Sequence, residues 1–105
     1  MRFDIHADKG GNYSWRLIAR NGQQVCWAGE SFASKSNAER AARAFRTGAA
    51  NARFEVYEDA GGHWRWRAHR GGHKVAASGE AFASKSNAQR AADNVRDKAA
   101  DAAEV

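Results

Sequence analysis

The sequence FASKSNAERAA (residues 32–42) returns almost unchanged as FASKSNAQRAA (residues 82–92). A match of this length indicates an internal duplication with a period of about fifty residues. The chain of 105 residues therefore divides into a first repeat, residues 1–51, and a second repeat, residues 52–105. Because a unit of this size buries little surface alone, we expect both repeats to share one core with pseudo-twofold symmetry.

The duplication extends towards the N-terminal side of each repeat. GGNYSWR (residues 10–16) returns as GGHWRWR (residues 61–67), in the same order relative to the longer match. The second copy has lost one residue, near Arg20 or Arg70. Each repeat thus carries the same succession of local patterns.

Alternating apolar and polar residues predict three strands in the first repeat. The apolar positions are Phe3, Ile5 and Ala7, then Tyr13, Trp15 and Leu17, then Val25 and Trp27. Asn21-Gly22 predicts a short hairpin turn, since both residues tolerate positive φ. Cys26 falls on the opposite side of its strand from Val25 and Trp27.

A helix is predicted to follow the strands of each repeat. Ser34 can cap it, or Ser36 can form a capping box with Glu39. Small apolar residues recur at helical spacing on one face, so the helix can lie close to the sheet. Large sheet residues must then fill the remaining volume, and the candidates are Phe3, Tyr13, Trp15 and Trp27.

These patterns predict an α+β fold built from two tandem β-β-β-α repeats. We expect one antiparallel sheet with both helices packed on one face. The second unit begins at Arg53-Phe54, directly after the first helix. A short terminal strand, Ala103-Glu104-Val105, could pair at an edge of the sheet.

The charge balance is modestly basic. Lys and Arg number 17 and Asp and Glu 12, a net charge of +5, and basic residues are interspersed with acidic ones rather than gathered in an arm. No apolar signal segment follows the charged N-terminus, and no stretch approaches the ~20 apolar residues that span a bilayer. We expect a cytoplasmic protein without membrane contact, either a monomer or a weak dimer through free sheet edges.

The motifs of the second repeat resemble those of the YegP-like family of small bacterial and archaeal proteins. The matching residues are Phe54, Asp59, Gly62, Trp64, Arg65, Trp66, Arg67, Ser78, Gly79, Glu80, Phe82, Ser84, Lys85 and Ala88. The resemblance covers both repeats and implies β-β-β-α-β units with exchanged C-terminal strands, of uncharacterised molecular function. The join between the repeats is short, which leaves open whether the first exchanged strand is continuous with residues 53–56.

The sequence offers little for metal binding. His63 and His69 would lie ~20 Å apart on one strand. His69 and His73 flank the Gly71-Gly72 turn and could meet across a hairpin, but two histidines without a third ligand make a weak site. We predict no metal and no cofactor.

Catalytic chemistry is equally poorly supported. Cys26 has no counterpart in the second repeat, where Ala76 stands, and a packing thiol is the better interpretation. Glu30 and Glu80 are equivalent and could face each other for acid–base work, although such residues more often bond a turn or a helix N-terminus. We therefore predict that the protein is not an enzyme.

Arginines on the face of the sheet away from the helices are the one functional lead. Basic residues on an open sheet can contact phosphates and base edges. The candidate nucleic-acid-binding residues are Arg16, Arg20, Arg65, Arg67 and Arg70. Three strands before a helix that opens with Ser-Lys-x-x-Ala also resemble the arm-site DNA-binding domain of phage-type integrases. On the other interpretation, these arginines pair with Asp4, Glu55 and Glu58 on neighbouring strands.

Two functions follow from these observations. The first is a non-enzymatic binding or interaction module, as the family resemblance implies, with an unidentified protein as a possible partner. The second is a nucleic-acid-binding protein that uses the basic face of its sheet.

Overall fold

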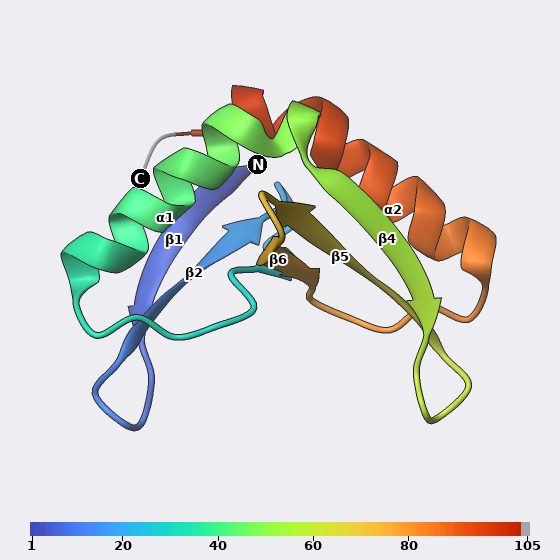
Figure 1. Ribbon diagram of the computed structural model, residues 1–105, viewed down its shortest axis with the longest axis horizontal. Helices are drawn as coiled ribbons and strands as arrows, with labels where there is room; N and C mark the ends of the chain where they lie inside the picture. Colours follow the sequence, from blue (N-terminus) through green and yellow to red (C-terminus); the bar gives the residue numbers. More distant parts are fainter. Residues whose placement is uncertain (104–105) are drawn as a thin grey trace.

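The computed structural model describes residues 1–103 as one six-stranded antiparallel sheet with two helices on one of its faces (Figure 1). The elements are β1 (Arg2–Ala7), β2 (Tyr13–Ile18), β3 (Gln24–Trp27), α1 (Lys35–Gly48), η1 (Ala49–Asn51), β4 (Arg53–Glu58), β5 (Trp64–Arg70), β6 (His73–Ser78), α2 (Lys85–Lys98) and η2 (Ala99–Asp101). Each repeat supplies three strands and one helix. This confirms the predicted α+β fold of two fused β-β-β-α units.

The two repeats meet at the centre of the sheet. The strand order is β1-β2-β3-β6-β5-β4, so the third strands of both repeats are neighbours. They pair through Cys26 with Ser78 and Trp27 with Ala77. Helix α1 packs on β1 and β2, whereas α2 packs on β4 and β5. The arrangement has the pseudo-twofold symmetry that the duplication predicted.

The chain passes between the repeats without a separate exchanged strand. Helix α1 ends in the short 3-10 helix η1, and β4 begins at Arg53, immediately beyond it. At the other end, Ala103 forms a parallel bridge with Arg2 of β1. The end of the second repeat therefore lies beside the first strand of the first repeat. Glu104 and Val105, which the sequence placed in a terminal strand, lie outside the described residues.

Serine side chains begin both helices. Ser34 Oγ accepts a hydrogen bond of 3.1 Å from Asn37 N, and Ser84 Oγ accepts an equivalent bond from Asn87 N. The alternative capping box from Ser36 is not formed, because Ser36 already lies inside α1. This cap fixes where α1 starts and hence which residues face the sheet, namely Ala38, Ala42 and Phe45.

The core lies between the helices and one face of the sheet. Trp15 and Trp66 occupy equivalent positions, and both are fully buried. Phe45 of α1 stacks on Trp15 with ring centroids 5.1 Å apart, and Phe3 meets Trp15 edge to face at 5.4 Å. Such aromatic contacts fill the volume above alanine-rich helix faces, as the sequence predicted for these large side chains.

Trp27 does not belong to this core, contrary to the prediction. Leu17 pairs with Cys26, so Cys26 shares the face that the helices cover, and Trp27 lies beside Arg16 on the other face. The register shifts between Leu17 and Ile18, and this β-bulge leaves Val25 without a direct partner. A bulge reverses which residues share a face, and alternation along one strand cannot reveal it.

The hairpin turns also differ from the prediction. In the first repeat Ala19 N bonds to Gln23 O and Gly22 N to Ala19 O, which closes a three-residue loop. Gly22 has a φ of 86°, while Asn21 is not left-handed. In the second repeat Gly71 and Gly72 form a two-residue turn with φ values of 56° and 81°. The residue lost from the second copy is therefore a turn residue.

Within residues 1–103, no helix combines the length and the apolar character needed to cross a membrane.

Candidate functional site

The face of the sheet away from the helices carries a row of residues across all six strands. Pairing between neighbouring strands places them in the order Asp4, Arg16, Trp27, Ala77, Arg67 and Glu55. We call this set the sheet row. From the β1 edge the order is acid, arginine and tryptophan, and from the β4 edge it is acid, arginine and alanine. The two halves of the row therefore differ in chemical type only at the centre, at Trp27 and Ala77.

The arginines of this face are matched by acidic residues. Arg16 Nε donates to Asp4 Oδ2 at 2.9 Å, and Arg67 Nε donates to Glu55 Oε1 at 2.7 Å. The guanidinium of Arg67 also lies 4.4 Å from the centre of the Tyr57 ring. The hydrogen bond from Arg67, followed by one from His69, holds the pKa of Glu55 below its usual value. The charges of the sheet row are thus compensated locally.

Arg65 has a partner in its own hairpin. Its Nε donates to Asp59 Oδ2 at 2.8 Å, and Asp59 Oδ1 accepts bonds from the backbone of Gly61 and His63. The hydrogen bond from Arg65, followed by those from the backbone, holds the pKa of Asp59 below its usual value. Glu58, which the sequence offered as a partner for these arginines, is exposed and forms no ion pair within residues 1–103.

The other two candidate arginines are not part of this face. Arg20 is exposed in the loop between β2 and β3. Arg70 ends β5, and its Nη1 donates to the carbonyl oxygen of Ala44 in α1 at 3.2 Å. Of the five predicted residues, three lie on this face, Arg20 lies in a loop, and Arg70 lies at the end of β5 against α1.

The histidines do not gather around a common point. His69 pairs with Lys74 in the sheet and lies 3.3 Å from Glu55 Oε1, whereas His73 pairs with Arg70. Across residues 1–103, no group of three or more metal-ligating side chains occurs.

The two equivalent glutamates leave the central strands in opposite directions. Glu30 lies three residues beyond Trp27, and Glu80 lies three residues beyond Ala77. Because β3 and β6 are antiparallel and pair at Trp27 and Ala77, the chain runs from this pair towards the two glutamates in opposite directions. The paired-carboxylate arrangement is thus not formed. Burial raises the pKa of the Cys26 thiol, in keeping with a packing role.

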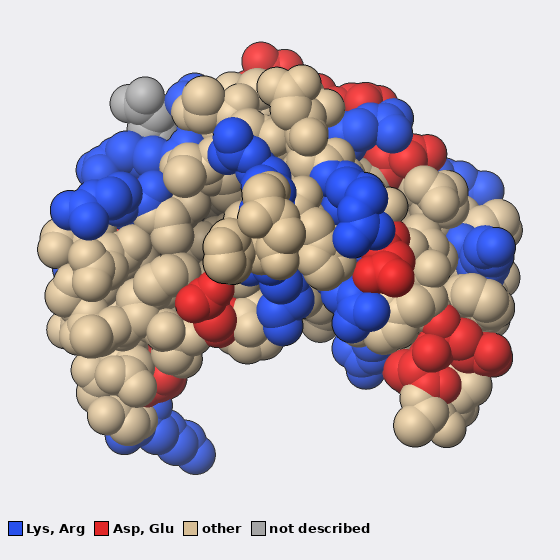
Figure 2. Space-filling view, in the orientation of Figure 1, with Lys and Arg blue, Asp and Glu red and all other residues tan. Residues whose placement is uncertain are grey.

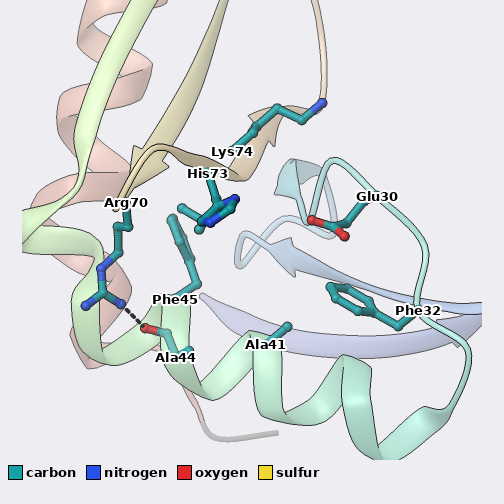
Figure 3. A pocket seen from close by; sticks show the side chains of 9 residues that line it. Glu30, Phe32, Ala41, Ala44, Phe45, Arg70, His73 and Lys74 are labelled. Carbon is teal, nitrogen blue, oxygen red and sulfur yellow. Dashed lines mark hydrogen bonds between the residues drawn. The ribbon is translucent and has the colours of Figure 1, made fainter.

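A cavity of about 320 Å³ lies where the two repeats meet, between α1 and the start of β6 (Figure 3). Its apolar lining comes from Phe32, Ala41, Ala44, Phe45 and Val75. Its polar lining comes from Glu30, Arg70, His73 and Lys74. We call it the junction cavity, because both repeats contribute to it.

A β-bulge shapes this cavity. Ala68 pairs with Ala76 and His69 pairs with Lys74, so Val75 has no direct partner. The extra residue bends the strand and redirects its side chains, and Val75 lines the cavity with Phe45. Lys74 runs along Gly29, where a Cβ atom would lie 2.9 Å from Lys74 Cε. The absence of a side chain at Gly29 therefore leaves space for the Lys74 side chain along the cavity wall.

A second cavity of about 370 Å³ adjoins the first along α1. It is lined by Asn37 and Arg40 together with Phe32, Ala41 and Ala44, which line both cavities. We call the two together the junction groove. It follows α1 from Asn37 to Phe45, eight residues or ~12 Å. Figure 2 shows basic side chains gathered over the α1 side of the molecule.

In the second repeat, the cavity that corresponds to the part of the groove along the helix is lined by Phe82, Asn87, Arg90, Ala91 and Asn94. Asn94 replaces Ala44 in the sequence, and Gln23 and Gln24 replace His73 and Lys74. The groove thus combines an alanine of the first repeat with cations of the second.

Sequence reasoning did not identify this groove. Phe45 was predicted in the core and His73 as a turn residue, but Phe32, Arg40, Ala44 and Lys74 received no role. The signal that could have identified the groove is the set of positions at which the two repeats carry different residues. Such differences mark the places where the two halves of the molecule are not equivalent.

Comparisons with known proteins agree with the duplication. The model of a family described as "Domain of unknown function (DUF1508)" matches twice, at residues 8–55 and 59–105. None of the curated proteins matches the sequence.

Solved structures show the same fold. The protein of unknown function YegP from E. coli superimposes with a TM-score of 0.80 at 18% identity, covering 99% of this chain and 88% of the other. A UPF0339 protein from Shewanella oneidensis gives 0.79 at 14% identity, covering 94% and 84%. At these identities the likeness extends to the fold alone.

Proposed function

The chain belongs to the DUF1508 family, with one domain of unknown function in each half, and on this premise we propose that it is a non-enzymatic binding module that holds a polypeptide partner in the junction groove. The observation that carries the proposal is an apolar groove with cationic ends, to which both repeats contribute side chains.

The lining of the groove favours binding over catalysis. Its residues include no serine, threonine or cysteine that could act as a nucleophile. Glu30 and His73 both line it, yet no hydrogen bond joins them to fix a proton-transfer geometry. Apolar surface with a few polar groups around it is the usual composition of a recognition site.

The shape of the groove favours a chain over a compact ligand. The junction cavity is at the lower end of the range for small-molecule sites, and the space continues along α1. An extended chain of about four residues spans ~12 Å. Helix and strand contribute opposite walls, so such a segment would contact both repeats.

A peptide display experiment tests this proposal. Random heptapeptides are selected on the wild-type protein and on the double variant A44N/K74Q, in which each residue is replaced by its counterpart in the other repeat, Asn94 or Gln24. We expect peptides that are enriched on the wild type and lost on the variant. No enrichment over an empty support, or equal enrichment on both proteins, would refute the proposed function.

Nucleic-acid binding has weaker support. It would need Arg16, Arg65 and Arg67 to neutralise phosphates, but each already bonds an acidic side chain. Counterion release, which drives such binding, depends on uncompensated cations.

A further inference from the structure

The cations of the junction groove lie at its two ends. Arg40 lines the end along α1, and Arg70 and Lys74 line the end at the repeat junction. Within residues 1–103, neither Arg40 nor Lys74 forms an ion pair. Glu30 is the one acidic residue of the lining, so three cations and one carboxylate leave a net charge of +2 with His73 neutral.

The apolar surface lies between these cations. Ala41 and Ala44 form one wall with their small side chains, and Phe32 faces them from the segment after β3. Phe45 and Val75 line the deeper, junction end. A ligand that is apolar in the middle and anionic at both ends would match this order of groups.

We infer that the groove takes one extended acidic peptide segment, in which carboxylates flank about four mainly apolar residues. This rests on the proposed function and specifies its ligand. One carboxylate would meet Arg40, and the other would meet Lys74 at the junction end of the groove. Apolar side chains would enter the space among Phe32, Phe45 and Val75, with Glu30 free to accept backbone N–H groups of the ligand.

The stoichiometry follows from the difference between the repeats. At the place related to the groove by the pseudo-twofold symmetry, Gln24 of the first repeat stands for Lys74, so one of the two cationic ends is missing. Asn94 adds a polar amide where Ala44 leaves apolar surface. We therefore expect one peptide per chain, although the fold contains two similar halves.

Reversing one charge in each repeat provides a matched test. Arg40 and Arg90 occupy equivalent exposed positions on α1 and α2. The probe is the acetylated and amidated peptide ELFLFE, with QLFLFQ and KLFLFK as charge variants, titrated into the full chain. Amide chemical shifts report the site, and calorimetry reports affinity and stoichiometry.

We expect ELFLFE to bind once and to shift residues of the groove. R40E should weaken binding about tenfold, because it replaces an attraction by a repulsion, whereas R90E should leave the affinity unchanged. QLFLFQ should bind more weakly than ELFLFE, and KLFLFK should bind most weakly of the three.

Several outcomes would overturn this inference. One is that R40E and R90E weaken binding equally, and another is that two peptides bind per chain. The others are that ELFLFE and QLFLFQ bind with equal affinity, or that millimolar ELFLFE changes no amide chemical shift. If the display experiment still enriches peptides that depend on Ala44 and Lys74, the groove remains a binding site and only its acidic specificity is wrong. Failure of both experiments would reject the proposed function as well.

Discussion

Ser31 Oγ donates a hydrogen bond of 3.0 Å to Asp8 Oδ2, in the place that Arg65 takes for Asp59 in the second repeat. The other oxygen of Asp8 accepts backbone bonds from Gly10 and Asn12, as in the second hairpin. Where the second repeat has Arg65, the first has Ser14. In the first repeat the Asp8 carboxylate is therefore held by the neutral hydroxyl of Ser31. The hairpin survives the loss of an arginine because the backbone bonds are common to both.

Acid should destabilise the protein through these carboxylates. The backbone N–H of Asn12 and the Ser31 hydroxyl hold the pKa of Asp8 below its usual value, and the pKa values of Asp59 and Glu55 are lowered in the same direction. Groups with lowered pKa stabilise the fold above their unfolded pKa of about 4, and this contribution is lost as the pH falls through the folded pKa.

Urea unfolding between pH 7 and pH 2 measures this effect. The midpoint should fall below about pH 4 in the wild type, and D59N should flatten that fall. E58Q removes an exposed carboxylate of β4 and is the control. Identical pH profiles for D59N and the wild type would contradict the assignment.

The two hairpin turns should respond differently to alanine. Gly71 has a φ of 56°, where a Cβ atom costs about 1–2 kcal/mol. Asn21 is not left-handed, and N21A removes two exposed hydrogen bonds, one that Asn21 Oδ1 accepts from Gln23 N and one that Asn21 Nδ2 donates to Gln23 Oε1, worth about 0.5 kcal/mol each because water replaces them. G71A should therefore lower the free energy of unfolding more than N21A, as measured by chemical denaturation. The reverse order would mean that the turn geometries are exchanged.

Truncation of a buried helix side chain to alanine should cost more stability in the first repeat than in the second. Phe45 is buried and stacked on Trp15, so F45A should cost about 3–5 kcal/mol. Val95 occupies the equivalent buried position, and V95A removes two methyl groups, at about 2 kcal/mol. Differential scanning calorimetry of both variants compares the two sites directly. Equal losses would show that the aromatic stack adds nothing.

Releasing the arginines of the sheet row from their acidic partners should increase the affinity of the protein for nucleic acid. D4N/E55Q leaves Arg16 and Arg67 without their acidic partners. Fluorescence anisotropy with labelled random single-stranded and duplex DNA should show salt-sensitive binding for the variant, with a slope of log affinity against log salt near −2 for two phosphate contacts on duplex DNA. Binding by the wild type that weakens steeply with salt and is lost in R65A/R67A would instead favour the nucleic-acid function.

Much of the architecture follows from local patterns that the sequence displays. The duplication, the three strands and the helix of each repeat, and the Ser34 cap depend on spacing and on short-range hydrogen bonds, so they are legible along the chain. The place of Trp15 on the covered face follows from the same alternation. Cross-strand pairing of Arg16 with Asp4 and of Arg67 with Glu55 was also foreseeable from residue parity.

The positions of Trp27 and of the junction groove depend on contacts between strands and between repeats. The bulges at Val25 and Val75 depend on how two strands align across a turn, and one residue of register moves a side chain to the other face. The groove brings Ala44 and Lys74 together from different repeats, and nothing in either repeat by itself indicates that proximity. The repeated unit can be predicted from the sequence, because its strands and helix form from residues that are neighbours along the chain. The contact between units depends on distant residues, and only the packed fold supplies it.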